Sequence, residues 1–330
     1  MSMNRDGQLS FSDDPLLTGI NEVYQLIEEG DFPESIKKLD ELMNINPDYP
    51  GLTDCYRTAK FWANRSSEIS GLSGGKQTAD FLMREWENYK EYADKNNMVD
   101  SSAYTSAMKN IFFNASENYK KAFKDQESTA DNFDLLVNLG TCFLILGEYK
   151  PSIETLEYAR SSNKNDARLN SLLGEAYFHI DEVSRSLLFF KEAFFINPAD
   201  IDLKVLKSKP ILDLVDIVEK SKPGCRDVKE WIPVFGFVED VFYTRRNINN
   251  QQAETIKREI YSLEKNLREM NTGKIAESNI VPRLINKYIW MLDYFRFQNY
   301  NYESITDIKN RLIQLDKDIF EQFFKENEIK

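Results

Sequence analysis

The sequence is poor in the side chains that most metal and nucleophilic sites require. Among its 330 residues it has one histidine, His179, and three cysteines, Cys55, Cys142 and Cys225. A single histidine cannot supply a histidine-cluster metal site, and the cysteines form no C-x-x-C pair of the kind found in zinc ribbons. No motif around these residues indicates a Ser–His–Asp or Cys–His site. We therefore expect a protein that is not an enzyme and that needs no metal or cofactor.

Long apolar runs and an excess of positive charge are also missing. No stretch approaches the roughly 18 uninterrupted apolar residues that indicate a membrane-spanning helix, so no membrane insertion is expected. Residues 1–14 are polar and lack the apolar core of a signal peptide, which predicts a cytoplasmic protein. The formal net charge of −12 argues against a nucleic-acid partner, because nucleic-acid affinity depends on clustered Lys and Arg.

Apolar residues recur at helical spacing along most of the chain, and this periodicity predicts an all-α fold. Residues 1–14 are expected to form a flexible tail. A helix then begins near Leu16 and stops at Gly30, and a second ends at Asn46 and Pro47. Three longer helices are expected over residues 51–69, 77–96 and 102–126.

Residues 133–198 repeat themselves with an offset of 34 residues. In the first half of the unit, the residues that recur are Leu136 with Asn170, Leu139 with Leu173, Gly140 with Gly174 and Phe143 with Tyr177. In the second half they are Ser152 with Ser186, Leu156 with Phe190 and Ala159 with Ala193, while Lys164 aligns with Pro198. This spacing predicts two helix–turn–helix units in which Gly140 and Gly174 let the paired helices pack closely. Gly147 and Asn197 are expected to end helices.

This pattern resembles the tetratricopeptide repeat, and residues 16–47 resemble a degenerate third unit. The resemblance implies a superhelix, or solenoid, of helical hairpins with additional flanking helices. Members of this family hold an extended peptide or a helix on a concave surface lined by the first helix of each unit. The positions that the resemblance places in this groove are Asp134, Val137, Thr141, Leu144 and Ile145 in the first unit, and Arg168, Ser171, Glu175, Phe178 and His179 in the second.

The apolar members of this groove are Val137, Leu144, Ile145 and Phe178. Exposed together, they would form a patch that a soluble monomer rarely leaves open. One interpretation is that they bind an apolar or amphipathic segment of a partner. The other is that the chain's own flanking helices cover them.

Beyond Pro198 the repeat pattern ends. A helix can begin within residues 201–207, and a short helix is expected at 211–220. Lys222, Pro223 and Gly224 form the clearest turn and are predicted to mark a domain boundary. The aromatic segment 231–238 is interpreted as a buried loop that leads into a helix, with a short strand as the second interpretation.

Two later helices, 251–271 and 303–328, carry apolar residues at alternating spacings of three and four, which is typical of a coiled-coil seam. Both an intramolecular hairpin and dimerisation fit this spacing. We divide the chain into a tail (1–14), an N-terminal helical region with the degenerate unit (15–130), two repeat units (131–200) and a C-terminal helical region (201–330).

The function expected from these features is that of an adaptor or scaffold, which binds a protein or peptide partner through the groove or an adjacent aromatic surface. One alternative is a self-associating structural subunit, a homo-oligomer joined through the C-terminal heptad helices. Another is a sensor that holds a small apolar ligand between the repeats and residues 231–243.

Overall fold

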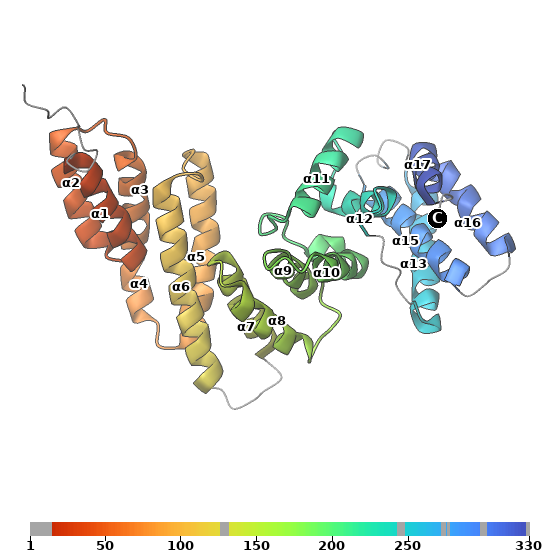
Figure 1. Ribbon diagram of the computed structural model, residues 1–330, viewed down its shortest axis with the longest axis horizontal. Helices are drawn as coiled ribbons and strands as arrows, with labels where there is room; N and C mark the ends of the chain where they lie inside the picture. Colours follow the sequence, from red (N-terminus) through yellow and green to blue (C-terminus); the bar gives the residue numbers. More distant parts are fainter. Residues whose placement is uncertain are drawn as a thin grey trace, which may run out of the picture. The chain divides into compact units, whose positions relative to one another are not determined.

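The computed structural model describes residues 15–125, 132–242, 248–271, 275, 278–297 and 302–327. All regular structure in these ranges is helical, so the prediction of an all-α fold is confirmed (Figure 1). The predicted tail at residues 1–14 lies outside the described residues. The chain forms two compact units, Met1–Thr155 (unit 1) and Leu156–Lys330 (unit 2). The division falls within helix α8 (Tyr149–Arg160), and therefore inside the segment 131–200 that carries the 34-residue repeat.

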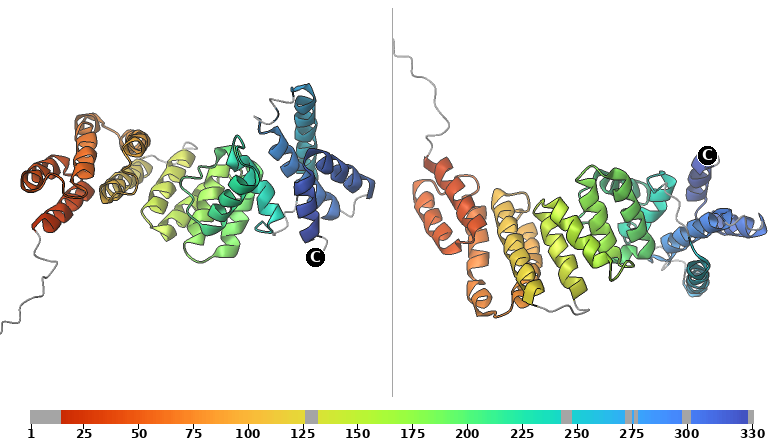
Figure 2. Two further views of the ribbon diagram at one scale, coloured as in Figure 1. Left: turned by 90° about the horizontal axis from the view of Figure 1, so that it is seen from above. Right: turned by 60° about the horizontal axis from the view of Figure 1, so that its bottom comes forward.

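Unit 1 is built from helix pairs around an aromatic core. Helix α1 packs on α2 and α6, and the two longest helices, α5 and α6, pack side by side (Figures 1 and 2). Trp62 and Trp86 stack with ring centroids 6.5 Å apart, and Tyr89 packs against both rings. The helices are α1 (Pro15–Glu29), α2 (Phe32–Ile45), α3 (Leu52–Ala63), α4 (Ser66–Gly71), α5 (Gly75–Lys95), α6 (Ser102–Asp125) and α7 (Asn132–Ile145).

The single helix predicted over residues 51–69 is wrong, because α3 and α4 are separate helices. The chain leaves the first helix at Asn64 and Arg65, where the Arg65 side chain turns back over the helix end. Its Nη1 donates to the carbonyl oxygen of Phe61 at 2.8 Å, and its guanidinium lies 3.5 Å from the centre of the Phe61 ring. This contact satisfies a carbonyl that the helix end leaves without an intrahelical partner.

Unit 2 is organised around α12 and α15, which pack against each other inside one apolar core. Helices α9 and α10 form a tight hairpin, α11 packs on α12, and α13 and α16 pack on α15 (Figures 1 and 2). The helices are α9 (Ala167–Phe178), α10 (Val183–Ile196), α11 (Lys209–Ser221), α12 (Val228–Val238), α13 (Asn250–Glu269), α15 (Ile280–Phe297), α16 (Tyr302–Leu315) and α17 (Lys317–Asn327), with a short 3-10 turn, η2 (Pro198–Asp200).

The segment 231–238 was predicted as a buried loop that leads into a helix, with a strand as the second interpretation. It is mostly buried, but all of it lies in α12, with Pro233 inside the helix. Nearly every residue of α12 is buried, so its sequence shows no polar face and no helical period. The predicted boundary at Lys222, Pro223 and Gly224 joins α11 to α12, which pack together within unit 2. Residues 201–207 form turns rather than a helix.

The helix predicted at 303–328 is divided into α16 and α17 at Asp316. The Asp316 side chain accepts a hydrogen bond from the backbone N–H of Ile319 at 3.1 Å, which is an N-cap contact that starts the second helix. A 2.5 Å ion pair with Lys222 holds the other carboxylate oxygen.

Local signals within the repeat act as expected. Gly147, two residues after the end of α7, adopts a φ of 78°, which favours glycine, and Asn197 ends α10. At Gly174 a Cβ atom would lie 2.8 Å from the Phe190 ring, so α9 and α10 approach each other as closely as glycine allows. Within the described residues, every helix is too short or too polar to cross a bilayer.

Candidate functional site

The ten predicted groove residues divide equally between the two units. In unit 1, α7 carries Val137 and Leu144 as buried side chains with exposures of 0% and 6%. Asp134 on the same helix is exposed, and Thr141 and Ile145 are half-buried. Thr141 Oγ1 donates to the Val137 carbonyl oxygen at 2.8 Å. Two of the apolar side chains proposed to meet a partner are therefore covered, and their part in binding stays a prediction.

In unit 2, the remaining five residues lie on α9 and directly after it. Ser171 and Glu175 are buried, Arg168 and Phe178 are half-buried, and His179 is the exposed C-cap residue of the helix. In this set the carboxylate of Glu175 is buried, whereas the ring of Phe178 is partly exposed to solvent. These two residues, Glu175 and Phe178, have different roles in the structure.

Glu175 anchors the segment that leads into α11. Its Oε1 accepts the backbone N–H of Lys207 at 2.7 Å, and its Oε2 accepts the backbone N–H of Ser208 at 3.1 Å. His179 Nε2 lies 3.0 Å from the same Oε1. A carboxylate that is 1% exposed and accepts two backbone N–H groups stabilises the local fold. Glu175 therefore holds the start of α11 in place, and both of its oxygens are used.

Phe178 lines an open apolar pocket of about 350 Å³. We call it the Phe178 pocket, and its apolar lining consists of Phe178, Leu187, Pro210, Leu214, Ile217 and Val241. These residues come from the end of α9, from α10, from α11 and from the chain that follows α12. The anchoring contacts of Glu175 position this pocket, because they fix the start of α11, which forms one of its walls.

Charged residues border the Phe178 pocket. Lys209, Asp213 and Asp240 line it beside the apolar side chains. The same two helices, α10 and α11, also expose large apolar residues outside the pocket lining: Val183 (43%), Leu188 (47%) and Leu212 (44%). An apolar depression with mixed charge at its edge suits an amphipathic ligand better than a purely apolar one.

Sequence reasoning found Phe178 but missed the other residues of this pocket. Leu187 and Ile217 have no special position in the repeat, and Val241 lies outside it. The signal available in the sequence was the excess of apolar residues on α10, where Val183, Leu187 and Leu188 exceed what one buried face requires.

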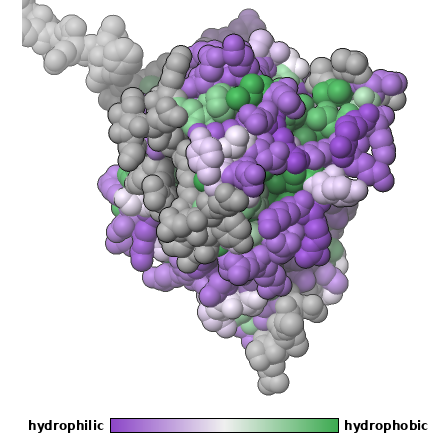
Figure 3. Space-filling view, turned by 90° about the vertical axis from the view of Figure 1, so that its right-hand side faces the viewer, coloured by the Kyte–Doolittle hydropathy of each residue, from purple (hydrophilic) through white to green (hydrophobic). Residues whose placement is uncertain are grey.

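The apolar stripes of the C-terminal helices are mostly used inside unit 2. Ile256 and Ile260 of α13, and Ile308 and Leu312 of α16, belong to one core cluster that also contains α15. Figure 3 shows one face of the structure in space-filling form, on which hydrophobic areas are separated by hydrophilic ones. An intramolecular packing thus accounts for the coiled-coil spacing of these four residues.

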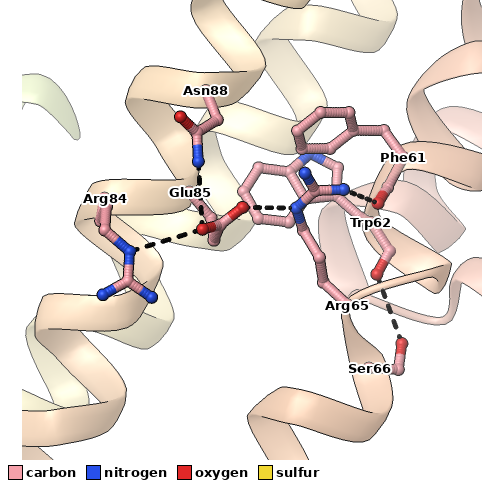
Figure 4. A network of polar contacts seen from close by, with 7 residues as sticks. All are labelled: Phe61, Trp62, Arg65, Ser66, Arg84, Glu85 and Asn88. Carbon is pink, nitrogen blue, oxygen red and sulfur yellow. Dashed lines mark hydrogen bonds and ion pairs between the residues drawn. The ribbon is translucent and has the colours of Figure 1, made fainter.

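Unit 1 contains a polar network centred on Glu85, whose carboxylate has a partner at each oxygen (Figure 4). Arg65 Nε donates to Oε2 at 2.7 Å, and Asn88 Nδ2 donates to Oε1 at 3.1 Å. Arg84 forms a longer ion pair of 3.5 Å with the same Oε1. Burial raises the pKa of Glu85, but these contacts outweigh burial and leave the pKa below its usual value. The network holds α5 against the Arg65 turn.

Comparison of the chain with protein-family models and with curated proteins finds no match. Among the described residues, no three His, Cys, Asp or Glu side chains gather as a metal-binding group would. A function must therefore be argued from the geometry of the chain, where Phe178, one of the predicted groove residues, lines an open apolar pocket.

Proposed function

We propose that the protein is a non-enzymatic adaptor that binds an amphipathic segment of a partner polypeptide in the Phe178 pocket. The observation that carries this proposal is the apolar lining of an open pocket at a groove position of the 34-residue repeat. The resemblance of residues 133–198 to tetratricopeptide repeats supports it, since hairpins of that family bind peptides and helices. A solenoid arrangement of the hairpins and a cytoplasmic location belong to the same proposal.

The chemistry of the pocket specifies the kind of segment that fits. Phe178, Leu187 and Ile217 offer an apolar surface for two or three large side chains on one face of a helix. Asp213 and Asp240 outnumber Lys209 at the edge, and the whole chain carries a net charge of −12. A segment with basic residues flanking its apolar face is therefore complementary, because opposite charge speeds encounter and fixes orientation.

The small-ligand alternative concerns the same pocket. Such a ligand was expected between the repeats and residues 231–243, and the pocket is lined by Phe178 of the repeats and by Val241 of that segment. Sites for small apolar ligands enclose most of the ligand surface. The Phe178 pocket is open to solvent and bordered by charges, which favours a polypeptide. The self-association alternative has less support, because the stripe residues Ile256, Ile260, Ile308 and Leu312 are already packed in the core of unit 2.

A fluorescent amphipathic peptide of Leu and Lys, about 16 residues long, tests this proposal by fluorescence anisotropy. We expect saturable binding that Phe178→Asp and Ile217→Asp weaken by about tenfold or more, because each places a charge in the apolar pocket. Ile313→Asp is the matched control, since Ile313 is 38% exposed on α16 and lines none of the described pockets.

All three variants add the same negative charge, so a loss of binding at the pocket can be told apart from a general electrostatic effect. Each substitution makes the protein more acidic, so non-specific attraction of the basic peptide would grow in all three variants. Binding that is unchanged or stronger in folded Phe178→Asp and Ile217→Asp would contradict the proposal. A Leu–Glu peptide of the same length is expected to bind more weakly than the Leu–Lys peptide to the wild-type protein.

A further inference from the structure

A second pocket in unit 2, of about 310 Å³, has a polar wall and an apolar wall. We call it the Glu230 pocket. Its polar wall includes Glu230 of α12 and Arg283, Asn286 and Lys287 of α15, which are spaced so that they share one face of that helix. Its apolar wall is formed by Phe195 and Ile196 at the end of α10 and Leu263 of α13.

Three buried oxygens of residues that line this pocket have no hydrogen-bond partner among the described residues, and one of them, Glu259 Oε2, is held instead by an ion pair of 2.7 Å with Lys287. The other two are Oε2 of Glu230, a residue that is 1% exposed, and Oδ1 of Asn286, a residue that is 4% exposed. The other Glu230 oxygen forms a short ion pair with Arg283, and this contact raises the pKa of the Arg283 guanidinium. Leaving a buried acceptor unpaired destabilises the fold, and more so when the acceptor is charged. Such groups are rare in folded proteins, and each calls for a donor from a water molecule or a ligand.

The cations around the pocket do not supply that donor. Arg283 contacts Oε1 of Glu230, and its side chain is 44% exposed. Lys287 Nζ forms a 2.7 Å ion pair with Glu259 and lies 5.8 Å from the centre of the Phe195 ring. The charges of Glu230, Glu259, Arg283 and Lys287 sum to zero. Oε2 of Glu230 and Oδ1 of Asn286 nevertheless have no hydrogen-bond donor among the described residues.

We infer that the Glu230 pocket binds a small molecule that carries an ammonium group on an apolar body. An ammonium group has three N–H donors, enough to serve Glu230 Oε2 and Asn286 Oδ1 together, whereas a hydroxyl has one. Its bond to the carboxylate is charge-assisted and roughly twice as strong as a bond between neutral groups. The apolar body then lies against Ile196 and Leu263, and the acidic chain favours the approach of a cation.

The test is an NMR titration of the 330-residue protein with 3-methylbutylammonium, in parallel with 3-methylbutanol and 4-methylpentanoate. We expect saturable binding of the amine, at least about tenfold weaker binding of the alcohol, and no binding of the carboxylate. Glu230→Gln turns the carboxylate into a neutral amide of nearly the same shape. The charge-assisted bond to the ammonium group is then lost, and amine binding is expected to weaken by about tenfold or more. Glu254→Gln on the exposed face of α13 is its matched control.

A second pair of variants keeps the test independent of the buried glutamate. Ser262 is exposed at the edge of the pocket, so Ser262→Phe fills the pocket without disturbing the core. Ser184→Phe makes the same change at an exposed position of α10 that lines none of the described pockets. Amine binding is expected to fall in Ser262→Phe and to stay unchanged in Ser184→Phe. Failure of the amine to bind the wild-type protein, equal binding of the alcohol, or unchanged binding in both Glu230→Gln and Ser262→Phe would overturn the inference.

Discussion

The two units share one way of burying a glutamate side chain, and unit 2 adds a second. In unit 1, both oxygens of Glu85 have partners, supplied by Arg65 and Asn88 (Figure 4). In unit 2, Glu175 likewise uses both oxygens, but Glu230 uses only one. Glu175 and Glu230 are equally buried, at 1% exposure, so burial alone does not explain the difference.

The difference separates structural from functional use of the same side chain. A buried carboxylate with a complete set of donors stabilises the fold and is closed to ligands. One that borders a pocket and keeps a free oxygen weakens the fold slightly and offers a binding contact. On this basis Glu85 and Glu175 are structural, although Glu175 occupies a position that the repeat pattern assigns to partner binding.

The largest effect is expected from Glu175→Gln. Glutamine has only one side-chain oxygen, so one of the two backbone N–H groups, Lys207 or Ser208, loses its acceptor. The free energy of unfolding of unit 2 should fall by about 2–3 kcal/mol. Urea-dependent hydrogen exchange of peptides from α11 and α12 measures this change. Glu230→Gln is the comparison at equal burial: it removes the charge of the ion pair with the partly exposed Arg283 but no backbone contact, so the expected loss is smaller, about 1 kcal/mol. If both variants lose the same stability, the comparison between the two carboxylates fails.

A smaller effect is expected from Glu85→Gln in unit 1, about 1 kcal/mol at neutral pH, because Glu85 and Arg65 keep some contact with solvent. The pKa of Glu85 in the folded protein lies below its usual value of 4.5. Its stabilising contribution is therefore complete above pH 4.5 and is lost as the pH falls through the lower, folded-state pKa. Unfolding of wild type and variant at several pH values checks this. A stability difference that stays constant or grows on acidification would contradict the assignment.

The smallest effect concerns the thiols. Cys55 and Cys142 of unit 1 are buried, whereas Cys225 of unit 2 is half-buried. Burial raises the pKa of Cys55 to about 12 and raises that of Cys142, and it also raises the pKa of the Cys225 thiol. Iodoacetamide should therefore alkylate Cys225 first under native conditions, as followed by peptide mass spectrometry. Earlier modification of Cys55 or Cys142 would show that unit 1 opens more readily than its packed core implies.

Local signals in the sequence were enough to predict most helices and several of their ends. Gly147 and Asn197 terminate helices because their backbone preferences act within a few residues. The all-α class was predicted from apolar residues at helical spacing, because a helix that packs on others buries one face along its length. Helix α12 was missed because it is buried on nearly all sides, so no polar face gave it a period. The break at Asp316 had a signal, an N-cap residue, that the apolar spacing of the flanking segments outweighed.

The candidate sites were less predictable, because they depend on which helices meet. Phe178 was identified through the repeat, but Ile217 and Val241 reach the same pocket only through the packing of the chain after it. Glu230 and Asn286 are 56 residues apart in the sequence numbering and meet because α12 packs on α15. No local pattern distinguishes Glu230 from the many surface glutamates of an acidic chain.

Hydrogen exchange with the Leu–Lys peptide tests the proposed function most directly. The peptide should slow exchange in α11 (Lys209–Ser221), which forms a wall of the Phe178 pocket, while α13 (Asn250–Glu269) keeps its rates. The same protection should be absent in Ile217→Asp. Protection of α13 instead of α11, or equal protection of α11 in Ile217→Asp, would contradict the assignment of partner binding to the Phe178 pocket.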